Sequence, residues 1–395
     1  MERRSPTRAR KVKRFYSSLA QAVVTRTKRL SRIVTGPDHM LLRKHKSVHR
    51  VHVDKVEHNP IISPLGHHDW ESVQTFNAAA VERNGSVHFF YRALGSDYVS
   101  RIGYATSRDG LMIDSRLPYP VYSIVSHDEH DTFPTYDSLQ YSSGGGWAGC
   151  EDPRVTFIDD RLYMFYVAFD GRNMPRIAMT SLTAEDFDRK EWNWTPAQII
   201  SQPGVVDKSG VLFPEKVQGK YVIMHRVFPD ILIDFVDTLD FPRGTYLQGE
   251  HRINIRPGAW DSRKIGAGAP PLKTNHGWLL IYYGVDEKDA SKYKMGAMLL
   301  DLNDPTKVLH RSSHPIIEPS DWYENEGHKA GIVYPCGALV KDGKLIIYYG
   351  GADTVVCAAY ADLETFLQQL MHKEQPALRT IFDGFKKTVK TAFRI

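Results

Sequence analysis

The stretch NHGWLLIYYGV (275–285) joins a turn to a strand, and it decides the fold because close copies of it recur along the chain. Gly, Asn or Asp in the turn tolerates the positive φ of a tight hairpin, and the aliphatic and aromatic residues that follow are typical of a β-strand. The other copies are NGSVHFFYRA (84–93), DDRLYMFYVAF (159–169), QGKYVIMHRVF (218–228) and DGKLIIYYGG (342–351).

A second strand-like run follows each of these five copies, so the repeated unit is a set of antiparallel strands. The copies lie roughly 60 to 75 residues apart. Five such units predict an all-β fold, a five-bladed β-propeller whose blades surround a central channel. A large β-sandwich is the alternative, but it would not explain five matched pairs of turn and strand.

The two ends of the chain differ from this repetitive body. Residues 1–50 hold 15 Lys/Arg and 2 Asp/Glu, although the whole chain has a net charge of only +5, so the body is acidic. We therefore expect a basic, partly helical N-terminal arm (1–54), a propeller catalytic domain (55–370) and a C-terminal helical tail (371–395). The arm is better suited to docking on the body or on a second subunit of a homo-oligomer than to binding nucleic acid or an anionic membrane.

The remaining composition is that of a soluble protein in a reducing compartment. No apolar run approaches the roughly 20 residues that span a bilayer, and the N-terminus has no apolar signal segment. Three cysteines are too few for a disulfide framework and do not form a zinc pattern, which favours a cytoplasmic location. The histidine-rich stretches HHDW (67–70) and HDEHD (127–131) are better explained as solvated loops than as metal sites, so no metal is expected.

A short polar segment leads into each repeated strand, and GCEDPRV (149–155) is one of five such leading segments. In a propeller these segments meet at one end of the channel, which is where we expect the functional site. Among the polar residues in or close to these segments and the strands that follow them, cations outnumber acids, and this favours an anionic ligand such as phosphate beside a sugar, although arginines such as Arg154, beside Glu151, also brace structures. The polar residues are Asn77, Arg92, Arg101, Glu151, Asp152, Arg154, Lys208, Glu215, Lys216, His225, Arg226, Lys264 and Asp353.

Several motifs in order resemble those of glycoside hydrolase family 130, which comprises β-mannoside phosphorylases and some β-mannosidases on a five-bladed propeller. They include NPIISP, FNAAAVE, GCEDPRV, FPEKVQGKYVIMHR and KIGAGAPPLKTNHGWLLIYYGV, and the resemblance covers about residues 55–370. It implies an inverting reaction in which a β-mannoside and inorganic phosphate give α-mannose 1-phosphate and a shortened acceptor. Such a hexosyl transfer needs no metal or organic cofactor, because phosphate is a co-substrate.

The resemblance also implies roles for individual residues. Asp152 matches the family's proton donor, which is thought to act through a sugar hydroxyl. Lys208 stands where an arginine is expected, and Val227 stands where a proline is common after the HR pair. The implied phosphate-binding residues are Lys208, Arg226 and Lys264, and the implied substrate-binding residues are Asn77, Arg92, Glu151, His225 and Asp353.

Three functions remain open from the sequence. The leading hypothesis is a β-mannoside phosphorylase, in which cations bind phosphate and no catalytic base is needed. An inverting β-mannosidase would use Asp152 as the acid and Glu215 as the base, unless Glu215 forms an ion pair with Lys216. A carbohydrate-binding propeller without catalysis is the third. The linkage, β-1,4 or β-1,2, and the acceptor sugar stay open as well.

Overall fold

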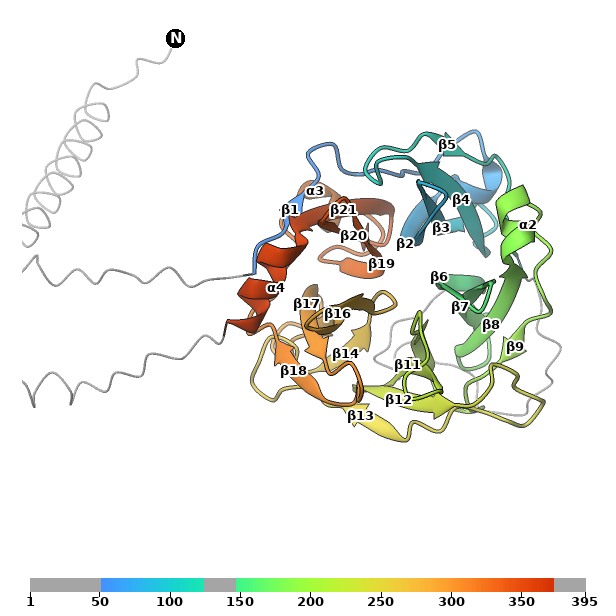
Figure 1. Ribbon diagram of the computed structural model, residues 1–395. Coiled ribbons are helices and arrows are strands. Elements are labelled where there is room, and N and C mark those ends of the chain that lie inside the picture. The colour runs from blue at the N-terminus through green and yellow to red at the C-terminus, as the bar shows by residue number, and fades with distance from the viewer. Residues whose placement is uncertain (1–50, 124–146, 373–395) are drawn as a thin grey trace, which may run out of the picture. The chain divides into compact units, whose positions relative to one another are not determined.

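The structure is a computed structural model that describes residues 51–123 and 147–372 (Figure 1). The chain divides into two compact units, Met1–Val48 and His49–Ile395, and every described residue lies in the second unit. The predicted basic arm, apart from residues 51–54, and the predicted C-terminal tail, apart from residues 371–372, lie outside the described residues. No helix of the described part is long and apolar enough to cross a membrane.

The described chain is mostly β-strand, which confirms the predicted all-β class, and its strands pair into four sheets. The largest contains β2 (Gln74–Arg83), β3 (Ser86–Leu94), β4 (Ser100–Ser107), β5 (Ser115–Arg116), β6 (Gly149–Ile158), β7 (Arg161–Phe169), β8 (Arg176–Thr183) and β9 (Gln198–Ile199). The second contains β10 (Asp207–Leu212), β11 (Tyr221–Val227), β12 (Asp230–Val236) and β13 (His251–Ile253). The third contains β14 (Lys264–Ala267), β15 (Leu272–Thr274), β16 (Gly277–Val285), β17 (Tyr293–Leu300) and β18 (Val308–Arg311). The fourth contains β1 (Asp54–Lys55), β19 (Val333–Lys341), β20 (Lys344–Gly351) and β21 (Val355–Asp362).

The largest sheet consists of two antiparallel groups that are joined at one point. A single parallel pairing, Ser100 with Gly149, connects β4 to β6, whereas all the other strand pairs in this sheet are antiparallel. With this join set aside, the described chain contains five antiparallel groups. Each of the five repeated stretches supplies the second strand of the hairpin that opens its group. These strands are β3, β7, β11, β16 and β20.

The hairpins that open these groups explain why the turn residues recur. In four of them two consecutive residues at the turn have positive φ, as the type I′ turn requires; three of these pairs directly join the paired strands, and Gln218–Gly219 lies within the bridge of Val217 and Lys220 just before β11. These pairs are Asn84–Gly85 (51° and 77°), Asp159–Asp160 (50° and 56°), Gln218–Gly219 (52° and 81°) and Asp342–Gly343 (50° and 75°). In the β15–β16 hairpin the positive φ falls instead on Gly277, directly after the turn.

The five groups lie around a common centre, with β2, β6 and β19 close to it (Figure 1). Successive groups contact one another through β2 and β6, β6 and β10, β10 and β14, and β16 and β19, and β19 contacts β2 in turn. The last group is completed by the start of the described chain, because Asp54 of β1 pairs with Tyr360 of β21. The strand pairings themselves do not close into a single sheet within the described residues.

Hydrophobic residues of neighbouring groups pack together to form the core. One cluster, for example, joins Val211 and Met224 of the second sheet to Ile265, Leu280 and Met298 of the third. The helices of the described part are η2 (Asp69–Glu71), α2 (Ala184–Arg189), α3 (Trp322–Asn325) and α4 (Leu363–Met371). Of these, α2 and α4 lie at the periphery of the strand groups (Figure 1). The hydrophobic core therefore lies between the strand groups, and polar residues of the innermost strands lie at the centre.

Candidate active site

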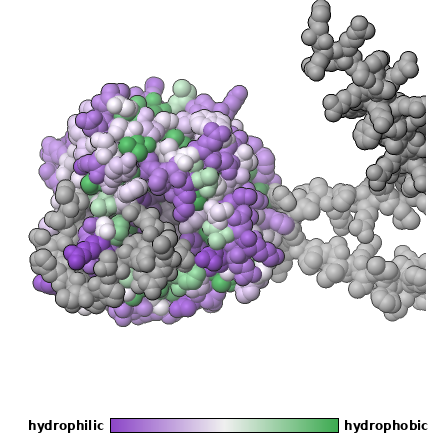
Figure 2. Space-filling model, turned by 180° about the vertical axis from the view of Figure 1, so that it is seen from behind, coloured by the Kyte–Doolittle hydropathy of each residue, from purple (hydrophilic) through white to green (hydrophobic). Residues whose placement is uncertain are grey.

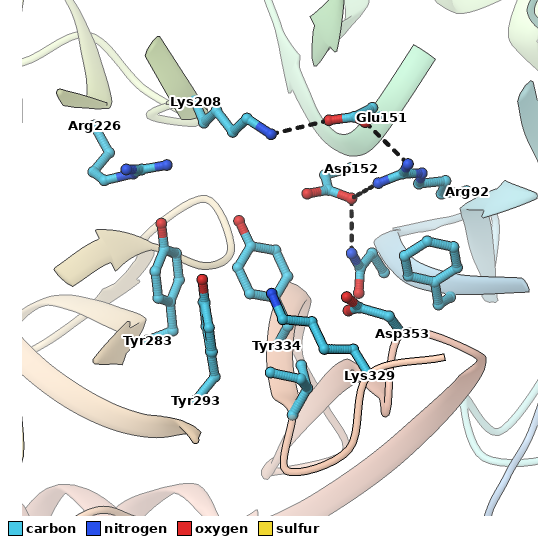
Figure 3. A pocket seen from close by; sticks show the side chains of 13 residues that line it. Arg92, Glu151, Asp152, Lys208, Arg226, Tyr283, Tyr293, Lys329, Tyr334 and Asp353 are labelled. Carbon is cyan, nitrogen blue, oxygen red and sulfur yellow. Dashed lines mark hydrogen bonds and ion pairs between the residues drawn. The ribbon is translucent and has the colours of Figure 1, made fainter. Parts of the chain in front are cut away.

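A polar pocket lies where the inner strands meet, and the leading segments predicted from the sequence contribute to it (Figure 3). Its empty space, including the open mouth, is about 510 Å³. Residues from all five groups line it: Phe76, Asn77, Arg92, Glu151, Asp152, Lys208, Arg226, Tyr283, Tyr293, Lys329, Ile332, Tyr334 and Asp353. Seven of the ten residues named above for catalysis, phosphate or substrate are among them, and Lys264, His225 and Glu215 are not.

Backbone bulges direct residues of three inner strands. The register shifts after Phe76 in β2, after Glu151 in β6 and after Lys208 in β10. The next residue in each strand, Asn77, Asp152 or Ser209, has a positive φ of 52°, 50° or 59°. Positive φ is uncommon for residues other than glycine, and a bulge re-aims a side chain that regular pleating would point elsewhere. The repeated bulge is therefore the local feature that places Asn77 and Asp152 in the pocket.

The carboxylate of Asp152 accepts hydrogen bonds from two side chains of the first antiparallel group, Asn77 of β2 and Arg92 of β3. Asn77 Nδ2 donates to its Oδ1 at 2.7 Å, and Arg92 Nη1 donates to the same oxygen at 3.2 Å. Burial alone would raise the pKa of Asp152, but the charges of Arg92 and Arg154, with the Asn77 hydrogen bond, lower it below its ordinary value. Without a ligand Asp152 is therefore ionised at neutral pH.

Glu151, next to Asp152, is held by two cations. Arg92 Nη2 donates to its Oε1 at 3.0 Å, and Lys208 Nζ donates to its Oε2 at 3.2 Å. Only 1% of Glu151 is exposed, so both of its carboxylate oxygens are engaged in a buried ion-pair network. Glu151 thereby fixes the side chains of Arg92 and Lys208 beside Asp152 (Figure 3).

Arg154 is buried and structural, but it does not brace Glu151 as its position in the sequence suggested. Its Nη1 donates to the backbone oxygen of Asp152 at 2.7 Å, and its Nε donates to the backbone oxygen of Gly268 at 3.0 Å. Its Nη2 donates to the hydroxyl of Tyr334 at 3.1 Å. Arg154 thus supports the strained backbone of Asp152 from the side of the third and fourth sheets.

Cations dominate one side of the pocket. Lys208, Arg226 and Lys329 all line it, and Figure 3 shows the side chains of Lys208 and Arg226 on the side away from Arg92. Lys264 is buried behind this group, where its Nζ donates to the Tyr293 hydroxyl at 2.5 Å. Burial and the nearby cations, first of them Arg226, lower the pKa of Lys264 to about 6. Two of the predicted phosphate-binding cations, Lys208 and Arg226, therefore line one end of the pocket. The third, Lys264, is buried behind them.

His225 lies outside the pocket lining, although the sequence placed it among the substrate-binding residues. Its Nδ1 is 2.6 Å from Asp207 Oδ2 and its Nε2 is 2.9 Å from Asp234 Oδ2. Burial opposes the charge, but the two carboxylates raise the pKa of His225 to about 9, so the ring is an imidazolium at neutral pH. Because both nitrogens are engaged, His225 ties β11 to β10 and β12, and its neighbours Arg226 and Lys208 are held at the pocket.

The position of Glu215 does not fit the role of hydrolytic base that the sequence suggested. Its side chain is 51% exposed and does not line the pocket, and it forms an ion pair with Lys273 rather than with Lys216. Lys216 in turn lies 3.4 Å from Asp159. The leading segment of the second sheet turns away from the centre after β10 ends at Leu212, so Glu215 reaches the surface. A base must be within reach of the attacking water, and this residue is not.

The pocket also contains residues that the sequence did not single out. Asp353 was expected, but Lys329 beside it was not, and burial raises the pKa of Asp353 although Lys329 opposes this. Tyr283, Tyr293 and Tyr334 form one wall, with ring centroids of Tyr283 and Tyr334 4.7 Å apart. Tyr283 lies in the repeated stretch 275–285, where the strand-like composition was the available signal. Lys329 lies in a loop, and no periodic pattern marks it.

The described residues hold no group of three or more His, Cys, Asp or Glu side chains that could bind a metal ion. The stretch 127–131, one of the two histidine-rich segments, lies outside the described residues. In the other, His68 Nδ1 is 2.6 Å from Glu71 Oε1, as part of a structural ion pair. Cys150, Cys336 and Cys357 are buried, and none of the three forms a disulfide.

Comparison with known proteins identifies the class of protein, which is a glycoside phosphorylase. A family model described as beta-1,4-mannooligosaccharide phosphorylase matches residues 49–372. The chain belongs to glycoside hydrolase family 130.

Individual relatives agree with this assignment. A 1,2-beta-oligomannan phosphorylase of Thermoanaerobacter sp. (strain X514) is 36% identical over 326 residues, which are 80% of this chain and 98% of the relative. The solved beta-1,2-mannobiose phosphorylase of Listeria innocua, in complex with beta-1,2-mannobiose, has 26% identity and a TM-score of 0.62, and the match covers 81% of this chain and 99% of that chain. Another solved structure, with 25% identity and a TM-score of 0.63 over 79% of this chain and 94% of that chain, comes from work describing family members that hydrolyse beta-1,2 mannosidic linkages in Candida mannan.

Proposed function

We propose that this protein is an inverting β-mannoside phosphorylase, which transfers a mannosyl unit from a β-mannoside to inorganic phosphate. The observation that carries the proposal is the juxtaposition of one hydrogen-bonded carboxylate, Asp152, with the cations Lys208, Arg226 and Lys329 in one pocket. A phosphorolytic enzyme needs an acid and an anion site, because phosphate is already an ionised nucleophile. This pocket offers both kinds of group.

In the proposed reaction an oxygen of phosphate attacks C1 of the mannosyl unit as the bond from C1 to the bridging oxygen breaks. The bridging oxygen takes the proton of Asp152, directly or through a sugar hydroxyl, and leaves as the hydroxyl of the shortened acceptor. The products are α-mannose 1-phosphate and the acceptor, and the carboxylate of Asp152 is reprotonated from solvent or from the next phosphate. Attack from the face opposite the leaving oxygen inverts the configuration at C1.

Phosphate also explains how an acid with a lowered pKa can act. Arg92 and the other cations lower the pKa of Asp152 in the unliganded protein. A phosphate anion bound between Lys208 and Arg226 would offset part of this positive charge, so the pKa of Asp152 would rise when both substrates are bound. Lys208 would hold phosphate as a point charge, whereas Arg226 has the planar guanidinium that suits bidentate binding.

The finer architecture and the biological setting belong to the same proposal. The five antiparallel groups and the contact between β19 and β2 support a five-bladed propeller with the active site at one end of its channel. We further propose that the reaction uses no metal or organic cofactor, that the enzyme is cytoplasmic and that it forms a homo-oligomer. The relatives named for β-1,2 linkages favour a β-1,2-mannoside as substrate.

The test is product analysis with β-1,2-mannobiose and β-1,4-mannobiose, each with and without inorganic phosphate. We expect mannose 1-phosphate only when phosphate is present, and a faster reaction with the β-1,2 disaccharide. Release of free mannose at equal rates in both conditions would refute phosphorolysis and support a hydrolase. Glu215→Gln is a useful control, because an exposed residue paired with Lys273 should leave the rate within twofold of the wild-type rate.

A further inference from the structure

Three aromatic side chains from separate loops meet at the surface, and we call Tyr98, Trp147 and His328 the aromatic rim. Tyr98 lies between β3 and β4, Trp147 lies just before β6, and His328 lies between α3 and β19. The ring centroids of Tyr98 and Trp147 are 4.9 Å apart, and those of Trp147 and His328 are 5.8 Å apart. The three rings therefore form a continuous aromatic strip that none of the hydrophobic core clusters includes.

One end of the aromatic rim is attached to the pocket wall. The backbone N–H of His328 donates to Thr354 Oγ1 at 2.8 Å, and the backbone N–H of Lys329 donates to the oxygen of Ala352 at 2.9 Å. Both bonds fasten the loop to the turn that carries Asp353. Lys329 and Asp353 line the pocket, so the loop that carries His328 also contributes to the pocket wall.

The chain at Trp147, the middle ring of the aromatic rim, is connected by hydrogen bonds to the side of the pocket that contains Asp152. The residue after Trp147, Ala148, accepts a hydrogen bond at its backbone oxygen from Ser100 N at 2.7 Å. Ser100 Oγ accepts from Arg92 Nε at 3.0 Å, and Arg92 binds Asp152. Hydrogen bonds thus connect the backbone at two points of the rim to residues of the pocket, and this connection is the reason for assigning the rim to the surroundings of the pocket mouth.

The aromatic rim is accessible from solvent. Tyr98 is 51% exposed, His328 is exposed and Trp147 is half-buried. On the face that Figure 2 shows, outside the grey atoms, hydrophobic residues are scattered among hydrophilic ones rather than gathered in one broad patch. Stable protein interfaces usually bury roughly 800 Å² on each partner, which a strip of three rings does not provide. A small ligand that continues out of the pocket suits this strip better.

We propose that the aromatic rim is a binding subsite for the sugar units of a β-mannooligosaccharide that follow the unit transferred in the pocket. This proposal rests on the proposed function, because it takes the mannosyl unit at Asp152 as the start of the chain. The C–H groups on one face of a mannose ring carry partial positive charge and pack against the negative face of an aromatic ring. A disaccharide ends near the pocket, whereas a longer chain reaches the rim, so the rim sets a preference for chain length.

The test compares β-1,2-mannobiose with β-1,2-mannotetraose as substrates for the full-length protein and for two variants, Trp147→Ala and Tyr98→Ala. We expect the ratio of kcat/KM for tetraose to kcat/KM for biose to fall about 5- to 10-fold in Trp147→Ala, with a smaller loss in Tyr98→Ala. Rates with the disaccharide should stay within about twofold, as expected for a subsite that touches only the longer chain. Tyr119→Ala is the matched control, since Tyr119 is also 51% exposed but does not belong to the rim.

An unchanged ratio in Trp147→Ala would overturn the proposal. If the wild-type protein phosphorolyses neither these substrates nor β-1,4-mannobiose, the proposed function fails, and binding then tests the rim separately. Calorimetric titration with β-1,2-mannotetraose should give an affinity about 5- to 10-fold weaker for Trp147→Ala than for wild type. Equal affinity of the two proteins, or no binding by the wild type, would contradict the rim as a subsite.

Discussion

The side-chain amide of Asn77 donates a hydrogen bond to Oδ1 of Asp152 at 2.7 Å, and both residues occupy β-bulges with positive φ. The pairing joins the inner strands of two different groups, 75 residues apart in sequence. It therefore fixes the direction of the carboxylate more firmly than either strand could alone. This relationship adds a positioning task to the sugar-binding role that the sequence assigned to Asn77.

Replacing Asp152 and Asn77 should separate chemistry from orientation. We expect Asp152→Asn to lower kcat at least about 10³-fold, because the amide cannot supply the proton. Asn77→Ala should lower kcat about 10- to 100-fold, with a smaller change in KM, since the carboxylate remains but is less well aimed. Steady-state kinetics with saturating phosphate would measure both effects, and thermal melting would check that each variant is folded. Substantial activity of Asp152→Asn would exclude it as the acid.

A substitution at Gly350 tests the orientation of the Asp152 carboxylate a second time, because it acts through Asn77 and leaves Asp152 itself unchanged. A Cβ built on Gly350 would lie 2.0 Å from Asn77 Oδ1, so the glycine makes room for the amide. We expect Gly350→Ala to displace Asn77 and to reduce kcat about 10-fold or more. Gly66→Ala is the matched control, because its Cβ would meet nothing within 4 Å. Equal kinetics of the two glycine variants would show that Asn77 tolerates the displacement.

How much of this was predictable from the sequence depends on whether the signal is local. The turns at Asn84–Gly85 and Asp342–Gly343, and the strands after them, follow from local propensity and alternation, so the repeated unit was predictable. Asn77, Arg92, Glu151, Asp152 and Asp353 could be expected in one site because their segments occupy equivalent places in the repeats.

Other features depend on tertiary contacts that no single segment contains. Glu215 was misjudged because the segment after β10 turns outward to Lys273, which a spacing argument does not show. His225 was assigned to the substrate, since its carboxylate partners Asp207 and Asp234 meet it only across paired strands. Lys329 lies in an irregular loop, and its place at the pocket follows from backbone bonds to the turn near Asp353. Each of these positions is determined by pairing between distant segments.

The buried imidazolium of His225 predicts a pH-dependent stability. Its pKa is raised to about 9 in the folded protein, whereas an unfolded histidine titrates near 6.5, so its contribution is fully present below about pH 6.5 and is lost as the pH rises through 9. The shift corresponds to about 3 kcal/mol of unfolding free energy. Urea unfolding of the wild type at pH 6 and pH 9.5 should show this loss, and His225→Gln should show much less of it.

A folded-state titration gives an independent measurement if His225→Gln does not fold. The NMR signal of the His225 ring, assigned by selective labelling, should titrate near pH 9 in the wild type. Titration near pH 6.5 would mean that Asp207 and Asp234 do not hold the charge. The stability prediction would then be wrong as well, because both measurements report the same proton.

Lys264 should take up a proton when an anion binds. Burial and neighbouring cations lower its pKa to about 6, so most of the population is neutral at pH 7, and an anion held by Arg226 and Lys208 would favour the charged form. Binding should therefore strengthen as the pH falls from 8 to 6. Sulfate is the suitable probe, because, unlike phosphate, it does not itself change charge in this range.

Calorimetric titration with sulfate at pH 7, in two buffers with different enthalpies of ionisation, would measure the uptake. We expect the apparent enthalpy to depend on the buffer, with an uptake approaching one proton for each sulfate bound. Lys264→Met should bind sulfate more weakly and without uptake, since it keeps the buried volume but has no site for the proton. An equal uptake in both proteins would assign the proton to another group, and Lys264 would then be a structural partner of Tyr293 rather than part of the anion site.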